Sequence, residues 1–166
     1  MQKLWQRNAL AAVVAAAAAT VFVVTDLLPE WTKYHHTVVP EHVIPAGATG
    51  TVDGRTWRID GVRHLNKAPT PRPQPLPDGT VLQIVTIERS GAAVPGESCA
   101  GVITDGRRRW NAEWNSGYGM VPPEGSTDNC TKAGPVQFSF LLPGDAVPTA
   151  VDVTAPDGQI RLRLEL

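Results

Sequence analysis

Two cysteines are the residues of this sequence whose chemistry is most readily predicted. Cys99 and Cys130 are the only cysteines among 166 residues, and both follow an apolar N-terminal segment that we expect to place them outside the cell membrane. An even pair of cysteines in an oxidising compartment is more often bonded than free. We therefore predict a disulfide, which would close a loop of about 30 residues and stabilise the fold by roughly 3 to 4 kcal/mol.

Three histidines are the candidate metal ligands. His35 and His36 are adjacent, and His42 follows. Adjacent side chains diverge in an extended chain, and no cysteine or paired carboxylate stands at ligand spacing, so we expect solvated or headgroup-level histidines, no metal and no cofactor. The sequence also lacks the G-x-S-x-G, H-E-x-x-H, Walker and G-x-G-x-x-G motifs. It thus favours a protein that is not an enzyme.

The loop between the cysteines contains candidate binding residues. Trp114, Tyr118 and Met120 lie in a Gly- and Pro-rich excursion, and aromatic residues on a loop held at its base are typical of a partner-binding surface. The alternative is that they fold back on the core. Residues 107–109 are three arginines, which either meet anionic headgroups or an acidic partner, or form the solvated end of a hairpin.

Charge and composition set the broad class of the chain. A net charge of -1 and a pI near 6.4 give no concentrated basic face, so no nucleic-acid partner is expected. Fifteen glycines and fifteen prolines are too many for a helical domain, because each interrupts or weakens a helix. This composition favours short strands joined by turns.

The uncharged run ALAAVVAAAAATVFVV predicts a transmembrane helix over residues 9–28, because about 20 helical residues cross a bilayer. Trp5 and Trp31, about 39 Å apart along a continuous helix, would lie in the two headgroup zones, and Tyr34 would reinforce the outer one. The competing interpretation is a signal peptide cleaved at Ala17–Ala19. Such cleavage would leave an apolar stretch on the mature protein, so we expect the anchor to be retained.

The charges beside this segment predict its orientation in the cell membrane. Lys3 and Arg7 precede it, whereas Asp26 and Glu30 follow it. The positive-inside bias then places residues 1–8 in the cytoplasm. We therefore expect a single-pass protein with an extracytoplasmic C-terminal domain.

Small residues repeat along one face of the predicted helix. Ala11, Ala15 and Ala19 form a small-xxx-small pattern, and packing on such a face drives helix association in membranes. We therefore predict an integral membrane protein complex as a partner, alongside the lipid bilayer. The alternative is that a GC-rich genome simply encodes many alanines.

The segment after the helix shows no sustained period. Pro29 would loosen the helix near its exit, and residues 29–49 mix aromatic residues, histidines and prolines. We predict an extended stalk here, with a strand near residues 38–44. No helical period of any length is visible beyond residue 31.

Alternation of apolar and polar residues predicts a β domain over residues 50–166. The period of two is clearest in IRLRLEL at the end of the chain. Seven to eight strands separated by Asp-Gly turns are typical of an antiparallel two-sheet sandwich. The predicted strands, besides that near 38–44, are 56–60, 80–88, 99–104, 108–114, 136–140, 151–154 and 160–166, with a hairpin at Asp105-Gly106.

Residues 67–79 contain five prolines and cannot form a central strand. We predict a stiff polyproline-like loop there. It serves either as a connector across a sheet edge or as a docking segment for a partner.

The order of GRTWRIDGV, GTVLQIVTIE, the strand at Cys99, DGRRRW, LLPGDAVPTAVDV and IRLRLEL resembles the immunoglobulin-like domains of small actinobacterial envelope proteins with one N-terminal membrane helix. The whole architecture is also similar to accessory subunits of mycobacterial machines such as MCE-type lipid transporters. The resemblance covers residues 50–166 and implies a mainly β, immunoglobulin-like sandwich. It also implies a non-catalytic accessory or scaffolding subunit of a larger membrane complex. The alternative is an anchored extracytoplasmic domain that binds a lipid or small ligand itself.

Overall fold

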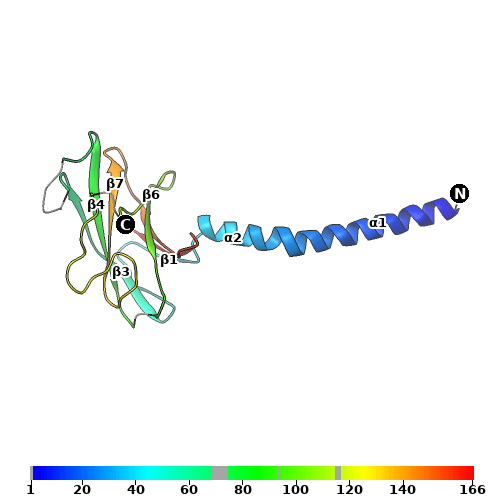
Figure 1. Ribbon diagram of the computed structural model, residues 1–166, viewed down its shortest axis with the longest axis horizontal. Coiled ribbons are helices and arrows are strands. Elements are labelled where there is room, and N and C mark those ends of the chain that lie inside the picture. Colours follow the sequence, from blue (N-terminus) through cyan, green and yellow to red (C-terminus); the bar gives the residue numbers. More distant parts are fainter. Residues whose placement is uncertain (1, 69–74, 93, 115–116) are drawn as a thin grey trace.

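The computed structural model describes residues 2–68, 75–92, 94–114 and 117–166. They form a long N-terminal helix joined to a β-sandwich (Figure 1). The helical part begins with α1 (Gln2–Phe22), continues through a π-helical turn, η1 (Val23–Leu27), and ends with α2 (Leu28–Val38). The predicted mainly β architecture after one apolar helix is therefore confirmed.

Pro29 explains the π-helical turn. Proline has no backbone N–H and disturbs the hydrogen bonds of the preceding turn, whereas it is well tolerated in the first turn of a helix. Pro29 lies in that first turn of α2, and the N–H of Leu28 donates to the carbonyl of Val23, one residue beyond the α-helical partner. The helix is thus locally widened near its predicted exit from the membrane.

The predicted extended stalk over residues 29–49 is wrong for about its first half. The chain stays helical to Val38 and becomes extended at Val39. Local contacts support these turns, because the rings of Trp31 and Tyr34 lie 6.1 Å apart and the Thr32 hydroxyl donates to the carbonyl of Leu28. Such an exposed helix needs no apolar face, so the sequence shows no helical period.

Nine strands in the described residues form two sheets. The four-stranded sheet has the order β2-β3-β4-β7, and the five-stranded sheet has the order β1-β9-β8-β5-β6. Their bounds are β1 His42–Ile44, β2 Gly50–Val52, β3 Arg55–Leu65, β4 Thr80–Arg89, β5 Ala100–Thr104, β6 Arg109–Asn111, β7 Val136–Pro143, β8 Ala150–Thr154 and β9 Ile160–Glu165. The hairpin predicted at Asp105-Gly106 joins β5 to β6.

One strand pair corrects the expectation of a wholly antiparallel sandwich. β1 pairs with β9 in parallel, with His42 opposite Leu162 and Ile44 opposite Leu164. This strand falls inside the predicted stalk, so the sandwich begins before residue 50. Burial supports this pairing, because it places Ile44 in the same core as Leu162 and Leu164.

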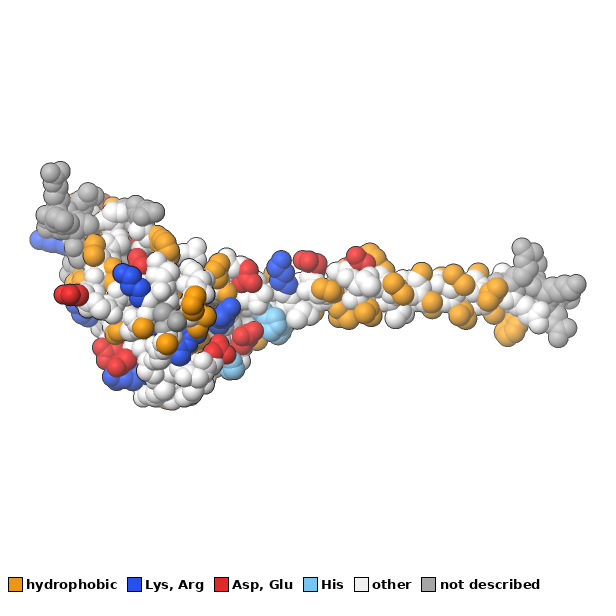
Figure 2. All heavy atoms as spheres, turned by 60° about the horizontal axis from the view of Figure 1, so that its bottom comes forward, with side chains coloured by type: hydrophobic (Ala, Val, Ile, Leu, Met, Phe, Trp, Pro, Cys, Tyr) orange, Lys and Arg blue, Asp and Glu red, His pale blue; other side chains and the backbone are white. Residues whose placement is uncertain are grey.

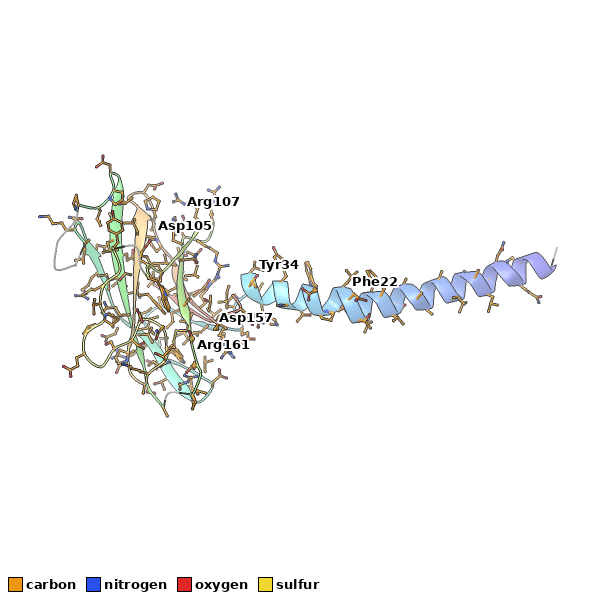
Figure 3. The ribbon with its side chains drawn as sticks, in the orientation of Figure 1. Phe22, Tyr34, Asp105, Arg107, Asp157 and Arg161 are labelled. Carbon is orange, nitrogen blue, oxygen red and sulfur yellow. A yellow bond between two sulfur atoms is a disulfide. The ribbon has the colours of Figure 1, made fainter. Side chains whose placement is uncertain are left out.

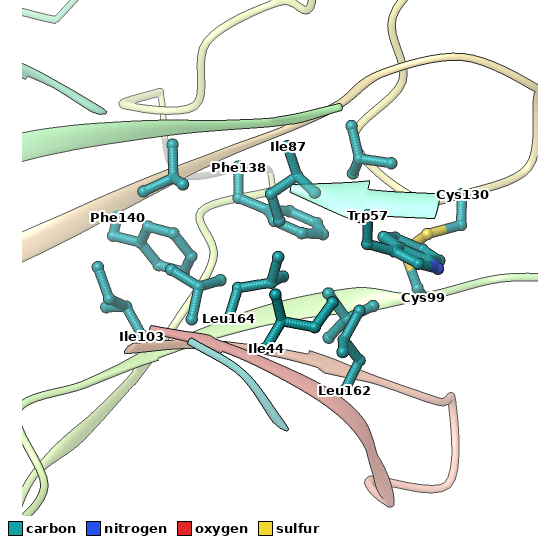
Figure 4. Packing of buried hydrophobic residues seen from close by; sticks show 14 of the residues in the cluster. Ile44, Trp57, Ile87, Cys99, Ile103, Cys130, Phe138, Phe140, Leu162 and Leu164 are labelled. Carbon is teal, nitrogen blue, oxygen red and sulfur yellow. A yellow bond between two sulfur atoms is a disulfide. The ribbon is translucent and has the colours of Figure 1, made fainter. Parts of the chain in front are cut away.

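The core lies between the two sheets (Figure 4). Phe138 and Phe140 point inward from β7, as the period of two predicts. Gly101 is required opposite them, because a Cβ atom at this position would lie 2.5 Å from the Phe138 ring. Close packing of this kind fixes the distance between the sheets.

The predicted disulfide is present. Cys99 and Cys130 are bonded, with 5.3 Å between their Cα atoms, and the N–H of Cys99 donates to the carbonyl of Asn129. Cys99 directly precedes β5 in the five-stranded sheet, whereas Cys130 belongs to the loop that leads into β7 in the other sheet. The disulfide therefore fixes the base of the long excursion between β6 and β7.

Candidate functional site at the junction of helix and sandwich

One helix in the described residues is long and apolar enough to span a membrane. It runs over Asn8–Val38, its most apolar stretch has a mean hydropathy of 2.2, and none of that stretch is buried in the protein. Hydrophobic side chains cover most of its length, and charged ones gather toward the sandwich (Figure 2). Trp5, Trp31 and Tyr34 are all exposed. The helix therefore has no partner within the described chain along its apolar part.

The predicted small-residue face is open. Ala11 and Ala15 line a shallow hollow along the helix, together with Leu10, Val14 and Ala18. Ala19 lies one turn farther along the same face, since four residues make slightly more than one turn. No other described segment of the chain covers this hollow.

A charged cluster joins the helix to the five-stranded sheet. Asp152 on β8 is fully buried, and Arg163 on β9 donates two hydrogen bonds to it, of 2.7 and 2.9 Å. Arg109 on β6 contacts the same carboxylate at 3.2 Å and donates to the backbone carbonyl of Thr37 at 2.9 Å. We call Thr37, Arg109, Asp152 and Arg163 the junction cluster.

The strand period explains how this carboxylate comes to face the helix. Val151 and Val153 point into the core, so Asp152 points outward, directly opposite Arg163 in the register of β8 and β9. A buried carboxylate is stable only when charged or hydrogen-bonding groups surround it. The bond to Asp152 raises the pKa of the Arg163 guanidinium above its ordinary value, outweighing its partial burial.

The C-terminal end of α2 complements the positive charge of the junction cluster. The last carbonyls of a helix lack intrahelical partners and carry partial negative charge, which favours a cation nearby. Two arginines and one aspartate leave the junction cluster with a net positive charge. Arg109 therefore satisfies a helix carbonyl and a buried carboxylate together.

Very little chain separates the helix from the first strand. The N–H of Val39 donates to the carbonyl of His35, and the N–H of Glu41 donates to that of Ile160. His36 lies 4.0 Å from the Glu41 carboxylate. The connection thus has no free linker, and the orientation of the helix is fixed by contacts on both sides.

A groove of about 510 Å³ lies beside the junction. Val38 at the end of α2, Val102 on β5, and Arg109 and Asn111 on β6 contribute to its walls. Trp114 also lines it and is about half exposed, at 51%. The groove is open to solvent and mostly apolar.

The loop residues predicted to form one surface make different side-chain contacts in the structure. Trp114 lies at the groove, whereas Met120 lies against the four-stranded sheet. The N–H of Met120 donates to the Ser139 hydroxyl, and its sulfur is 3.8 Å from Arg63. Tyr118 is half-buried. Met120 thus folds back on the sandwich, the alternative that the sequence left open, whereas Trp114 is about half exposed.

The three arginines at the β5–β6 hairpin have different environments. The N–H groups of Arg107 and Arg108 donate to the Asp105 carboxylate, and the Arg108 side chain also binds it. These bonds lower the pKa of Asp105 from 3.8 to about 2. The backbone N–H groups of Arg108 and Arg107 contribute most, followed by the Arg108 side chain. Arg109 alone belongs to the junction cluster. Asp105 and Arg107 lie on the side of the sandwich that faces the helix (Figure 3).

The three histidines considered as metal ligands lie in two different elements. His35 and His36 lie in α2 with ring centroids 6.0 Å apart, and His42 lies in β1. The described residues contain no group of three His, Cys, Asp or Glu side chains arranged for a metal ion. Residues 69–74 of the proline-rich segment 67–79 lie outside the described residues, and Lys67 and Pro75, on either side of them, form an isolated antiparallel bridge.

Asp152 and Arg163 were not among the residues predicted from the sequence. The signal was present, because a single aspartate in the apolar strand AVDVT must either face solvent or find a cation, and the arginines of IRLRLEL alternate in the neighbouring strand. Which strands are neighbours depends on the sheet order. The pattern alone therefore did not bring these residues together.

Comparison with known proteins adds little to this geometry. No protein-family model and no curated protein matches the chain. Among solved structures, the chain is similar to an uncharacterized β-sandwich protein from Clostridium difficile 630, with 10% identity over 77% of this chain and 95% of that chain, at a TM-score of 0.39. A likeness at this level carries no argument about function, which is therefore argued from the chain itself.

Proposed function

We propose that this chain is a non-catalytic, single-pass protein of the cell membrane that serves as an accessory or scaffolding subunit of a larger integral membrane complex. The observation that carries the proposal is the junction. The apolar helix continues into the sandwich through three residues and the bonds of Arg109 to Thr37 and Asp152. Such a connection holds the domain at a set height and orientation, which suits a brace or cap better than a flexible tether.

Placement in the bilayer follows from the helix. Residues 9–28 cross the hydrocarbon, with Trp5 and Trp31 at the two interfaces. The positive-inside bias puts the N-terminus in the cytoplasm and the sandwich outside. Val38 is seven residues beyond Trp31, or about 10 Å along the helix. The sandwich is thus held close above the headgroups.

The alanine face supplies the contact with the partner in the membrane. Ala11, Ala15 and Ala19 permit close approach of another helix where hydrophobicity cannot drive association. A second contact by the outer domain then forms at high effective concentration. Because the junction limits motion between the two contacts, less conformational entropy is lost on binding. An MCE-type lipid transporter is one complex of this kind.

The finer fold assignment is part of the same proposal. We assign an immunoglobulin-like sandwich, in which β1 pairs in parallel with β9, the last strand of the chain. Antibody domains carry a disulfide between strands of the two sheets. Cys99 and Cys130 instead lie before β5 and in the loop before β7. The disulfide of this chain is therefore a feature of its own.

The groove beside the junction favours a second candidate function, direct binding of a lipid or small ligand. Its volume of about 510 Å³ falls in the range of small-molecule sites, and Trp114 supplies an exposed aromatic wall. In this case, lipid would copurify with the chain, and Trp114→Ala would reduce the amount recovered per chain.

Purification from native membranes in a mild detergent tests the scaffolding role. Substituting Ala15→Ile with Ala19→Ile places bulk on the small-residue face, and we expect the copurifying integral membrane proteins to be lost. The matched control is Val13→Ile with Ala17→Ile, which adds bulk to the opposite face and should retain them. Equal recovery of partners with both pairs would contradict docking through the alanine face.

A further inference from the structure

A second charged cluster lies at the end of the sandwich away from the hairpin of arginines. The ring of Trp57 on β3 is buried, only 5% exposed, and packs beside the disulfide (Figure 4). The guanidinium carbons of Arg55 and Arg89 lie 5.8 and 5.5 Å from its ring centroid. Both arginines are themselves buried. Two guanidinium groups thus lie close to the indole.

One carboxylate serves both arginines. Glu97 lies 2.5 Å from Arg55 and 3.7 Å from Arg89. Burial of Glu97 raises its pKa, but the bond to Arg55 and the charges of both arginines outweigh burial and lower it overall. Arg89 also donates to the carbonyls of Cys130 and Lys132. The buried cluster therefore carries an excess of positive charge.

A cleft leads from the surface to this cluster. Its outer part, of about 400 Å³, is lined by Asp53, Arg55, Glu97, Ser98 and Arg161, among others. The same five residues also line its narrow inner end, together with Trp57 and both cysteines. The indole Nε1 of Trp57 is buried and has no hydrogen-bond partner among the described residues. The residue that carries this unpartnered donor therefore lines the inner end of the cleft.

The charged side chains at the outer opening of the cleft differ in whether they form ion pairs. Arg161 makes no ion pair with a described residue, whereas Arg55 is bonded to Glu97. Among the described residues that line the mouth, Asp53 is the acidic group that makes no such ion pair, although its charge acts on Arg55. Arg161 and Asp157 lie on the side of the sandwich toward the helix (Figure 3). The mouth therefore offers a free guanidinium near the expected membrane surface.

We propose that this cleft binds an oxyanion, such as a phosphate group, through the Trp57 indole N–H at its inner end and the Arg161 and Arg55 guanidinium groups at its mouth. A buried N–H without an acceptor costs free energy, and an anionic oxygen is the acceptor that forms the strongest bond to it. The excess positive charge of the cluster favours an anion over a neutral acceptor. The site goes beyond the scaffolding role and does not depend on it.

NMR of the indole N–H groups tests the site on the full chain in a phosphate-free sugar detergent. Trp57→Phe identifies the Trp57 resonance. We expect inorganic phosphate, titrated against sodium chloride of equal ionic strength, to shift this resonance with saturation. Arg161→Gln removes one charged contact and should weaken the apparent affinity about tenfold or more. Arg58→Gln, a change outside the cleft, should leave the affinity unchanged.

A parallel sample in phosphatidylglycerol nanodiscs identifies the source of the anion. A shift with inorganic phosphate assigns the site to a free oxyanion. A shift only in nanodiscs, lost in Arg161→Gln, assigns it to a lipid headgroup. An indole resonance that responds to neither, or that responds equally in Arg161→Gln, would overturn the proposal and indicate a cavity that holds water alone. Each result is independent of whether a partner complex copurifies.

Discussion

Arg109 on β6 donates a hydrogen bond of 2.9 Å to the backbone carbonyl of Thr37, in the last turn of α2. The same guanidinium contacts the buried carboxylate of Asp152, 3.2 Å away. A side chain of the sandwich thus binds the end of the helix while being held from behind by the sheet. The helix and the domain are therefore expected to move as one body.

Removing the arginine should loosen that connection. In Arg109→Ala, the helix end loses a cation that contributes about 0.3 to 1 kcal/mol, and the main tie across the junction is lost. Electron spin resonance distances between labels introduced as unnatural amino acids at Lys33 and Glu124 should be narrowly distributed in the native chain and clearly broader in the variant.

The neighbouring arginine provides the control for this measurement. Arg107 is in the same hairpin but contacts neither the helix nor Asp152, so Arg107→Ala should keep the narrow distribution. If Arg109→Ala is as narrow as the native chain, the junction is held by the short connection alone and the cluster does not fix the orientation.

Asp152→Asn should destabilise the sandwich. The change leaves Arg109 and Arg163 facing a neutral group in a buried position, and removing one partner of such a cluster costs about 3 kcal/mol or more. The urea midpoint of unfolding should fall accordingly. Asp145→Asn removes an exposed partner of Arg108 and should change the free energy of unfolding by less than about 0.5 kcal/mol. Equal midpoints for the two variants would contradict the role given to Asp152.

The strands and the disulfide could be predicted from the sequence for a physical reason. A half-buried strand must alternate, and VQFSF and IRLRLEL do so without interruption. The helix beyond Trp31 could not be predicted, because a solvent-exposed helix places no demand on periodicity. The parallel pairing of β1 was equally hidden, since three residues show no direction.

Only part of the junction cluster could be predicted from the sequence, for a related reason. Arg109 stood out as one of three adjacent arginines, but its difference from Arg107 and Arg108 depends on where the helix ends. Asp152 became important only when β8 was known to lie beside β9. Long-range neighbours of this kind follow from sheet order rather than from local pattern.

Acid should weaken the hairpin at Asp105. Its pKa is lowered from 3.8 to about 2 by the N–H groups of Arg108 and Arg107 and by the Arg108 side chain. A carboxyl whose pKa is lower in the folded than in the unfolded chain stabilises the fold fully above about pH 3.8 and loses that contribution as the pH falls toward 2.

Thermal unfolding of Asp105→Asn against pH checks this expectation. The variant should melt below the native chain at pH 6, and the difference should shrink steadily between pH 4 and pH 2, where the native carboxyl becomes protonated. A difference that stays constant over this range would show that Asp105 acts only through its shape and not through its charge.

The most direct test of the anchored, outward-facing domain is the intact mass of the native protein recovered from carbonate-washed membranes. We expect a chain that resists the wash and retains its whole N-terminal helix, with a mass near 17.8 kDa. A chain that begins after Ala19, or that is released to the soluble fraction, would contradict it.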